Sequence, residues 1–266
     1  DGSQWSARQL VMAVGQLSAP KTPTYPGQER FGGEIIHSAV WPKHKVDFTG
    51  KRVAIIGTGS SGMQMTPVIA RQAAHLTVFQ RTPHWVMPRP DRKLSGWQRA
   101  LLGIKPLHKA LRTLIYWELE TRVVGFKYSP WALQQFAQKA ALRHIEKQIA
   151  DPALRAAVTP DYTIGCKRII LSNTLYPALC RDNVSLHTKG SGIAEITPTG
   201  IRTTDGQDLA LDVIIYSTGY DATDGVISYP VLGKDGKAQE RVYDVAWADS
   251  DRRHPGKNGK LPSVGS

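Results

Sequence analysis

The chain has 266 residues, a hydrophobic content of 41% and a mean hydropathy of -0.29, which allow one large α/β domain or two smaller ones. No run approaches the roughly 20 apolar residues of a transmembrane helix, and the N-terminus lacks the pattern of a secretory signal. A net charge of +12 fits nucleic acid, an anionic membrane or an anionic cofactor. Because no nucleic-acid-binding motif accompanies this charge, we favour a solvated basic face around a polyphosphate site and expect no nucleic-acid partner.

The chain has two cysteines, Cys166 and Cys180. So few thiols argue against a disulfide scaffold and against a cysteine-based zinc site, so we expect no metal and a reducing, cytoplasmic location. The chain begins with Asp1 instead of Met, and we therefore expect a fragment or a processed chain.

Two segments precede the first strong motif. The apolar residues 10–14 predict a short buried strand, and three prolines between residues 17 and 29 predict an extended connector. Residues 31–42 then place an aromatic residue, a glycine, a histidine and a tryptophan at fixed spacing. Taken alone, this histidine fits a hydrogen-bonded structural residue better than a catalyst. The four residues are Phe31, Gly33, His37 and Trp41.

The strongest pattern is a G-x-G-x-x-G turn between an apolar strand at 53–56 and a helical segment, with a second strand at 76–79. The first glycine permits the tight turn, the second lets the backbone approach a pyrophosphate, and the third lets the helix pack on the strand. The N–H groups at the helix start then face the phosphates. This context predicts a dinucleotide site. Its residues are Gly57, Thr58, Gly59, Ser60, Ser61 and Gly62.

The end of the second strand indicates which dinucleotide binds. An NAD site has an acidic residue about 20 residues after the glycines, but this chain has Arg81 and Thr82 there. A guanidinium beside a hydroxyl suits a 2′-phosphate, so NADP is favoured over NAD. The alternative is that Arg81 is a solvated residue at a strand end.

Residues 91–157 change to helical periodicity with two apolar stripes, one of them from Leu107 to Leu119. Eleven Lys/Arg against four Asp/Glu lie between Asp91 and Lys147. The aromatic residues here suit contact with an apolar substrate or a membrane surface, but we favour packing between helices.

A second cationic segment, Cys166-Lys167-Arg168, directly precedes an apolar strand. Charge at this position fits either a cleft that binds an anion or an ordinary strand entry. A strand at 183–186, a hairpin-like excursion over 192–206 and a buried strand at 212–216 follow, and Thr218-Gly219 comes directly after them.

The spacing F-x-G-x-x-x-H-x-x-x-W-P at residues 31–42, followed by G-x-G-x-x-G, resembles the fingerprint of the type I Baeyer–Villiger monooxygenases, which are class B flavoprotein monooxygenases. The stretch Gly165 to Arg168 is similar to the family's G-x-K-R segment. The stretch from Asp212 to Gly219 is similar to the D-x-(I/V)-(I/V)-x-A-T-G return strand, with Ser217 in place of the usual alanine. The resemblance covers roughly residues 10–247.

The resemblance implies an FAD- and NADPH-dependent enzyme that uses O2 to convert a small ketone into an ester or lactone through a C4a-peroxyflavin. It implies that Lys167 assists binding of the 2′-phosphate and that Arg168 is the catalytic arginine beside the flavin. It further implies that His37 lies at the interdomain connection and supports domain motion. Cys166 has no role in this family.

We therefore expect an α/β architecture with two dinucleotide-binding domains. The expected divisions are a flavin-domain remnant and linker with the fingerprint (1–45), the first part of a Rossmann-like NADPH-binding domain (46–90), a helical insertion (91–160), the second part of the NADPH-binding domain (161–216), and a return to the flavin domain with a divergent tail (217–266). A G-x-G-x-x-G for FAD is absent from the sequence, so we expect the isolated chain to bind FAD poorly. Two alternatives are an N- or S-oxidising flavin monooxygenase and a catalytically incompetent NADP-binding module.

Overall fold

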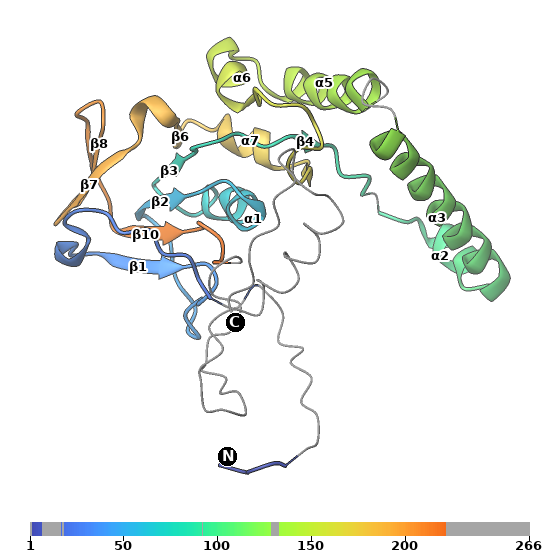
Figure 1. Cartoon of the computed structure of the whole chain (residues 1–266), viewed down its shortest axis with the longest axis horizontal. Coiled ribbons are helices and arrows are strands. Elements are labelled where there is room, and N and C mark those ends of the chain that lie inside the picture. The colour runs from blue at the N-terminus through green and yellow to red at the C-terminus, as the bar shows by residue number, and fades with distance from the viewer. Residues whose placement is uncertain (1, 7–16, 18, 92, 129–132, 222–266) are drawn as a thin grey trace, which may run out of the picture. The chain divides into compact units, whose positions relative to one another are not determined.

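The computed structural model describes residues 2–6, 17, 19–91, 93–128 and 133–221 (Figure 1). Its contacts divide the chain into two compact units, one comprising Thr24–Ser217 and the other comprising Asp1–Pro23 with Thr218–Ser266. The strand expected at 10–14 and the tail expected after 248 lie outside the described residues. Residues 24–45, which we expected to group with the flavin domain, belong to the same unit as the nucleotide-binding strands.

A five-stranded parallel sheet forms the centre of the larger unit, in the order β1-β10-β2-β3-β6 (Figure 1). This arrangement confirms the α/β fold class and the Rossmann-like order of strand, glycine turn, helix and strand. The strands are β1 (Glu34–His37), β2 (Arg52–Ile56), β3 (His75–Phe79), β6 (Val184–His187) and β10 (Val213–Tyr216).

Both faces of the sheet are covered, as the unbroken apolar strands require. On one face, Val53, Ile55 and Val213 pack against α1 (Ser60–Ile69) and α7 (Leu175–Leu179). On the other face, Ile56 and Tyr216 pack against the antiparallel strands β7 (Ile193–Thr197), β8 (Gly200–Thr203) and β9 (Asp208–Ala210). The expected hairpin over 192–206 is therefore confirmed, and it is part of a three-stranded sheet.

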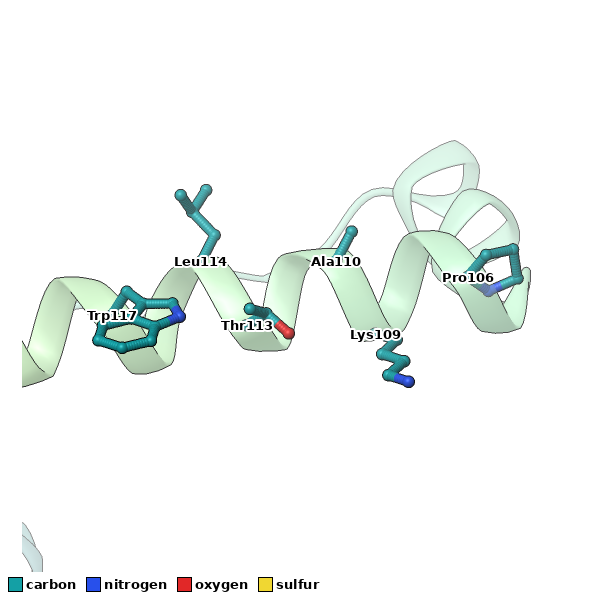
Figure 2. A pocket seen from close by; sticks show the side chains of 6 residues that line it. All are labelled: Pro106, Lys109, Ala110, Thr113, Leu114 and Trp117. Carbon is teal, nitrogen blue, oxygen red and sulfur yellow. The ribbon is translucent and has the colours of Figure 1, made fainter.

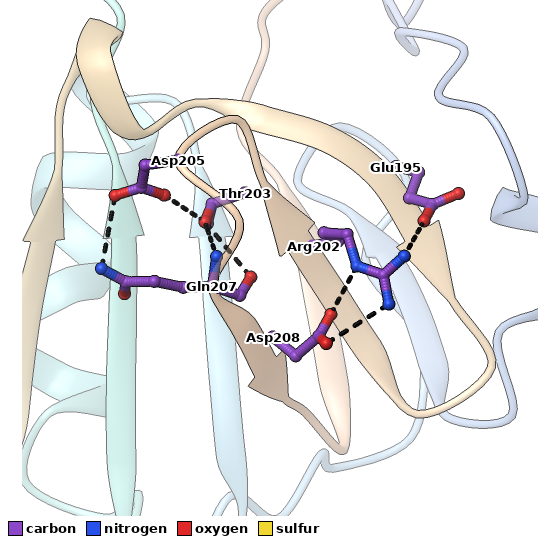
Figure 3. A network of polar contacts seen from close by, with 6 residues as sticks. All are labelled: Glu195, Arg202, Thr203, Asp205, Gln207 and Asp208. Atoms are coloured by element: carbon purple, nitrogen blue, oxygen red, sulfur yellow. Dashed lines mark hydrogen bonds and ion pairs between the residues drawn. The ribbon is translucent and has the colours of Figure 1, made fainter.

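Ion pairs and hydrogen bonds stabilise the outer surface of this small sheet (Figure 3). The Arg202 guanidinium on β8 donates to Glu195 on β7 at 2.8 Å and to Asp208 on β9 at 2.8 Å, so it joins all three strands. At the turn between β8 and β9, the Thr203 hydroxyl donates to Asp205 and accepts from the backbone N–H of Gln207. Exposed ion pairs contribute little individually, so this network adds only modestly to stability.

The sequence analysis missed the strand β1, because it assigned no secondary structure to residues 31–42. Glu34–His37 pairs along its whole length with Val213–Tyr216. This close approach of the two strands requires a glycine at position 33. A Cβ there would be 2.4 Å from the carbonyl oxygen of Asp212 and 2.6 Å from the ring of Phe31. Phe31 packs against the core cluster that contains Ile56 and Tyr216. The spacing of the first fingerprint residues therefore has a packing reason.

The segment 91–160 is helical, as expected. It contains α2 (Gly96–Leu102), α3 (Lys105–Tyr128), the π-helix η2 (Leu133–Gln138), α5 (Lys139–Gln148) and α6 (Pro152–Val158). None of the described helices is both long enough and apolar enough to cross a bilayer. Of the second stripe, Ile145 on α5 is buried, whereas Phe136 is 72% exposed.

The packing between helices expected for the aromatic residues is wrong for Trp97, Tyr116 and Trp117, which are 68%, 56% and 62% exposed. Leu107, Leu111, Leu114 and Leu119 on α3 are all exposed, and Leu114 (Figure 2) is 67% exposed. Helical periodicity correctly predicted the helix, but it does not say what covers the apolar side.

Two short strands, β4 (Val86–Met87) and β5 (Ile170–Leu171), form a separate parallel pair. The strand expected after Arg168 is therefore present, but it lies outside the main sheet. Its position connects the segment after β3 with the segment that carries Lys167 and Arg168.

In the smaller unit, residues 19–21 pair with residues 219–221. The backbone N–H of Lys21 donates to the carbonyl oxygen of Gly219 at 3.0 Å, and the Thr218 hydroxyl donates to the carbonyl oxygen of Lys21. Gly219 has a φ of 88°, a conformation that glycine adopts without strain. This pairing joins the segment before the fingerprint to the segment after β10.

Candidate functional site

The glycine turn lies at the carboxyl end of β2, between the centre of the sheet and the start of α1. Gly57 has a φ of 105°, which favours glycine, and its backbone N–H donates to the carbonyl oxygen of Phe79 at 3.0 Å. A Cβ at Gly62 would be 2.1 Å from the carbonyl oxygen of Gly57, so the helix packs directly on the turn. The first and third glycines are thus required by the protein itself.

Gly59 has a different surrounding. It is the N-cap of α1, with an ordinary φ of -68°, and a Cβ there would meet no protein atom within 4 Å. The protein therefore does not require glycine at this position, whereas a ligand that approaches the backbone would.

The start of α1 is suited to an anion. No side chain caps it, and its first turn, which contains Ser60 and Ser61, has no acidic residue. The N–H groups of a first helical turn have no partner within the helix and carry the positive end of the helix dipole. A pyrophosphate supplies the acceptors that these groups lack. The residues present therefore fit the phosphates of a dinucleotide.

The carboxyl ends of all five strands meet at this edge of the sheet. In register, His37, Tyr216, Ile56, Phe79 and His187 are the last residues of β1, β10, β2, β3 and β6. In an open α/β sheet, ligands bind outside this edge at the point where the strand order reverses. The order β10-β2-β3 places the glycine turn of β2 at that point.

Arg81 and Thr82 follow β3 at the same edge, and Arg81 is exposed. Burial raises the pKa of Tyr25, and the nearby Arg81 guanidinium acts in the opposite direction. Tyr25 stacks on Tyr216 with ring centroids 6.4 Å apart, and the Tyr216 hydroxyl donates to Gln28 at 2.8 Å. Tyr25 of this stacked pair therefore lies near Arg81.

Lys167 is held next to the segment that follows Arg81. Its ammonium lies 4.7 Å from the ring centroid of Tyr162, and the Tyr162 hydroxyl donates to the carbonyl oxygen of Pro83 at 3.0 Å. The indole N–H of Trp85 donates to the carbonyl oxygen of Tyr162 at 2.8 Å. The structure therefore brings together two cationic segments that are more than 80 residues apart. Tyr162 was missed by the sequence analysis, because nothing in its local pattern marks it.

His84 belongs to the segment that follows Arg81 and lies near Lys167. Burial lowers the pKa of His84, and the positive charge of Lys167 lowers it further. Its Nδ1 is buried and has no hydrogen-bond partner among the described residues. We infer that His84 is neutral at pH 7, so the positive charge at this place comes from the lysine.

Arg168 and its neighbours form an exposed surface. Gly165 to Ile169 line a shallow hollow of about 350 Å³, and Gly165 has a φ of 98°. Cys166 in this segment is exposed and free. Arg168 is also exposed, so its guanidinium is available to a ligand or to another part of the protein.

The remaining fingerprint residues lie at the end of β1. The Nδ1 of His37 accepts a hydrogen bond from the backbone N–H of Ala39 at 3.1 Å, which places the proton of a neutral ring on Nε2. Trp41 is 40% exposed and contacts Phe48, with ring centroids 6.3 Å apart. Thr218 and Gly219 belong to the other compact unit and are described there.

Comparisons with known proteins identify the family of this chain. A family model described as flavin-binding monooxygenase-like matches residues 8–241. A "Baeyer-Villiger monooxygenase" of Pseudomonas aeruginosa is 44% identical over 237 residues, which are 89% of this chain and 44% of that protein. A protein of the same name from Streptomyces coelicolor is 45% identical over 88% of this chain and 44% of its own length.

Solved structures are similar as well. An oxidized steroid monooxygenase bound to NADP has a TM-score of 0.71 and 33% identity, with coverage of 85% of this chain and 50% of that one. A closed cyclohexanone monooxygenase has a TM-score of 0.66 and 29% identity, with coverage of 85% and 49%. The chain thus spans about half the length of the relatives that it matches. It belongs to the flavin-binding monooxygenase-like family.

Proposed function

We propose that the protein binds NADP(H) at the edge formed by β2, β3 and α1 and contributes this site to an FAD-dependent Baeyer–Villiger monooxygenase. In this proposal, NADPH and O2 are consumed while a small ketone becomes an ester or lactone. The observation that carries the proposal is the uncapped start of α1 at the glycine turn, together with the contact of Lys167 with Tyr162, whose hydroxyl bonds Pro83 two residues after Arg81.

The residues of this chain have separate tasks in binding. The N–H groups at the start of α1 bind the pyrophosphate, and Gly59 lets it approach the backbone. Arg81, Thr82 and Lys167 bind the 2′-phosphate through charge-assisted hydrogen bonds. No acidic residue follows β3 directly. Such a residue would accept a hydrogen bond from the 2′-hydroxyl of NAD and would repel the 2′-phosphate of NADP.

Bound FAD would supply the reduction and activation of O2. Arg168 would then hold a permanent positive charge beside the oxygen atoms that become negative during the reaction, because a guanidinium stays protonated at any relevant pH. A positive charge oriented in advance stabilises such a transition state without reorganisation of water. Phe31 and Gly33 would fix the start of β1, shortly after the chain enters this unit, and His37 and Trp41 would fix the end of β1.

The proposal places the reaction in the cytoplasm, where the free thiols Cys166 and Cys180 stay reduced. Homologues named as Baeyer–Villiger enzymes favour this reaction over oxidation of nitrogen or sulfur.

The test is the visible spectrum of the purified 266-residue chain after incubation with FAD and removal of free flavin, followed by addition of NADPH and then of a cyclic ketone in air. Retained flavin that is bleached by NADPH, with a lactone among the products, supports the whole proposal. NADPH binding with no retained flavin restricts the function of this chain to the NADP(H) site. Loss of both contradicts the proposal.

A further inference from the structure

We propose that the ring of Tyr162 is a positioning residue for NADP(H): it holds the Lys167 ammonium beside the segment that follows Arg81 and thereby favours a nucleotide with a 2′-phosphate. This inference rests on the proposed function, because it concerns the same NADP(H) site. The residue that it adds carries no charge and lies outside the glycine turn and outside the segment Gly165 to Arg168.

The Tyr162 ring is held in place from several sides. The indole N–H of Trp85 donates to the carbonyl oxygen of Tyr162 at 2.8 Å. The ring packs against a core cluster that consists of the buried residues Trp85, Ala141 and Ile164. Its hydroxyl donates to the carbonyl oxygen of Pro83 at 3.0 Å, and burial raises the pKa of Tyr162, so the hydroxyl keeps the proton that it donates. The ring is therefore a fixed surface beside a loop.

Lys167 lies over this fixed surface. Its ammonium is 4.7 Å from the centroid of the Tyr162 ring, within the roughly 6 Å over which a ring face attracts a cation. Lys167 belongs to none of the ion pairs formed among the residues that the structure describes. The aromatic face is thus the contact that restrains an otherwise flexible, exposed side chain.

Two observations place the ammonium at the segment after Arg81. Pro83, which accepts the hydrogen bond of Tyr162, lies two residues after Arg81. The positive charge of Lys167 also lowers the pKa of His84, so the ammonium lies near that residue. Because two or three residues span at most about 10 Å, the side chains of Arg81 and Lys167 can reach one phosphate group.

A restrained ammonium distinguishes two nucleotides. NADP(H) has a 2′-phosphate that accepts charge-assisted hydrogen bonds, whereas NAD(H) has a hydroxyl group there. With the ring in place, Lys167 has lost much of its rotamer freedom before the nucleotide arrives, so binding has less ordering left to do. Without the ring, this ordering falls on the complex with NADP(H) and not on the complex with NAD(H).

The experiment is isothermal titration of the 266-residue chain with NADP+ and with NAD+. The variants are Tyr162→Leu, which removes the aromatic face, and Tyr162→Phe, which keeps the face and loses only the hydrogen bond to Pro83. Tyr162→Leu should raise the Kd for NADP+ about 3- to 10-fold, the cost of immobilising one flexible side chain, and leave the Kd for NAD+ within about twofold. Tyr162→Phe should keep both Kd values within about twofold of the original.

A double-mutant cycle separates positioning of Lys167 from a general structural role. In a chain that already carries Lys167→Ala, Tyr162→Leu should not weaken NADP+ binding further, because the residue through which it acts is gone. Tyr116→Leu is the matched control at an exposed tyrosine of α3, and it should leave both affinities unchanged. Circular dichroism checks folding. If Tyr162→Leu does not fold, Tyr162→Met takes its place, because methionine fills irregular space without an aromatic face.

Three results overturn the inference alone. The first is a chain that prefers NADP+ through Lys167 while the leucine or methionine variant binds NADP+ as tightly as the original. The second is an equal loss of affinity for NADP+ and NAD+, and the third is the same loss in the presence and in the absence of Lys167. An original chain that does not distinguish NADP+ from NAD+, or whose preference survives Lys167→Ala, contradicts the proposed NADP(H) site and this inference with it.

Discussion

The glycine turn yields a prediction in which two neighbouring glycines have opposite consequences. Gly59→Ala adds a methyl group that meets no protein atom within 4 Å, at a residue whose φ of -68° suits alanine. Gly62→Ala adds a methyl group 2.1 Å from the carbonyl oxygen of Gly57 and 3.3 Å from the hydroxyl of Ser217. The first should disturb the ligand, and the second should disturb the protein.

The magnitudes follow from these surroundings. A methyl group forced into occupied space costs about 1–3 kcal/mol. For Gly62→Ala the cost falls on the folded state, and in a domain of this size it lowers Tm by about 2–12 °C. For Gly59→Ala the cost falls on the complex, and it raises the Kd for NADP+ by about 5- to 150-fold. The free protein should lose no more than about 1 kcal/mol of stability at this N-cap position.

Differential scanning calorimetry of the ligand-free variants and isothermal titration with NADP+ measure the two effects separately. Unchanged affinity of Gly59→Ala would refute the argument that the pyrophosphate lies against this residue. An unchanged Tm of Gly62→Ala would refute the close packing of α1 on the turn.

Three further predictions concern single residues. Lys167→Ala should raise the Kd for NADP+ about 10- to 150-fold and leave the Kd for NAD+ unchanged, because only the 2′-phosphate loses a charge-assisted hydrogen bond. Titration calorimetry with both nucleotides checks this, and an equal loss of affinity for the two would contradict it. Hydrogen bonds from Arg52 hold the pKa of Asp212 at about 2, below its usual 3.8, so the stability they contribute is present above pH 4 and lost as pH falls through 2. Asp212→Asn should therefore lower Tm at pH 7, with a deficit that shrinks toward pH 2, and a constant deficit in thermal scans would argue against this linkage. Ser217→Ala should raise Tm by about 2–4 °C, because it removes a buried hydroxyl with no partner among the described residues, and a lowered Tm would show that the hydroxyl is satisfied.

The sequence predicted the nucleotide-binding strands, turn and helix well because their signals are local. The apolar run before Gly57 and the glycine spacing each have a direct physical reason in the structure, namely a strand buried on both faces and a helix packed on the turn. Residues close in sequence determine these elements, so one chain suffices to recognise them.

The strand β1 was missed because Glu34–His37 is short and lies between glycine and proline signals that favour a connector. The only local signal for a strand here was the pair of β-branched residues Ile35-Ile36. Its pairing with β10 brings together residues about 180 positions apart, and such a partner is not encoded in local periodicity. The same limit hid the hydrogen bond from the Tyr162 hydroxyl to the carbonyl oxygen of Pro83, which joins residues 79 positions apart.

The helix α3 shows the limit of pattern in another way. The periodicity of its leucines correctly predicted a helix, but an amphipathic helix looks the same whether another helix, a second protein or a lipid surface covers it. The exposure of Leu114 and Trp117 shows that the described residues do not cover this helix. The sequence pattern alone could not show this.

The central claim is that the edge formed by β2, β3 and α1 is an NADP(H) site. Isothermal titration of the purified chain with NADP+ and with NAD+, side by side at low and at moderate salt, tests it most directly. The account predicts a single site that binds NADP+ at least about tenfold more tightly than NAD+, with a preference that weakens as salt rises. Equal affinity for the two, or tighter binding of NAD+, would contradict the role of Arg81 and Lys167, and no binding of either would contradict the site itself.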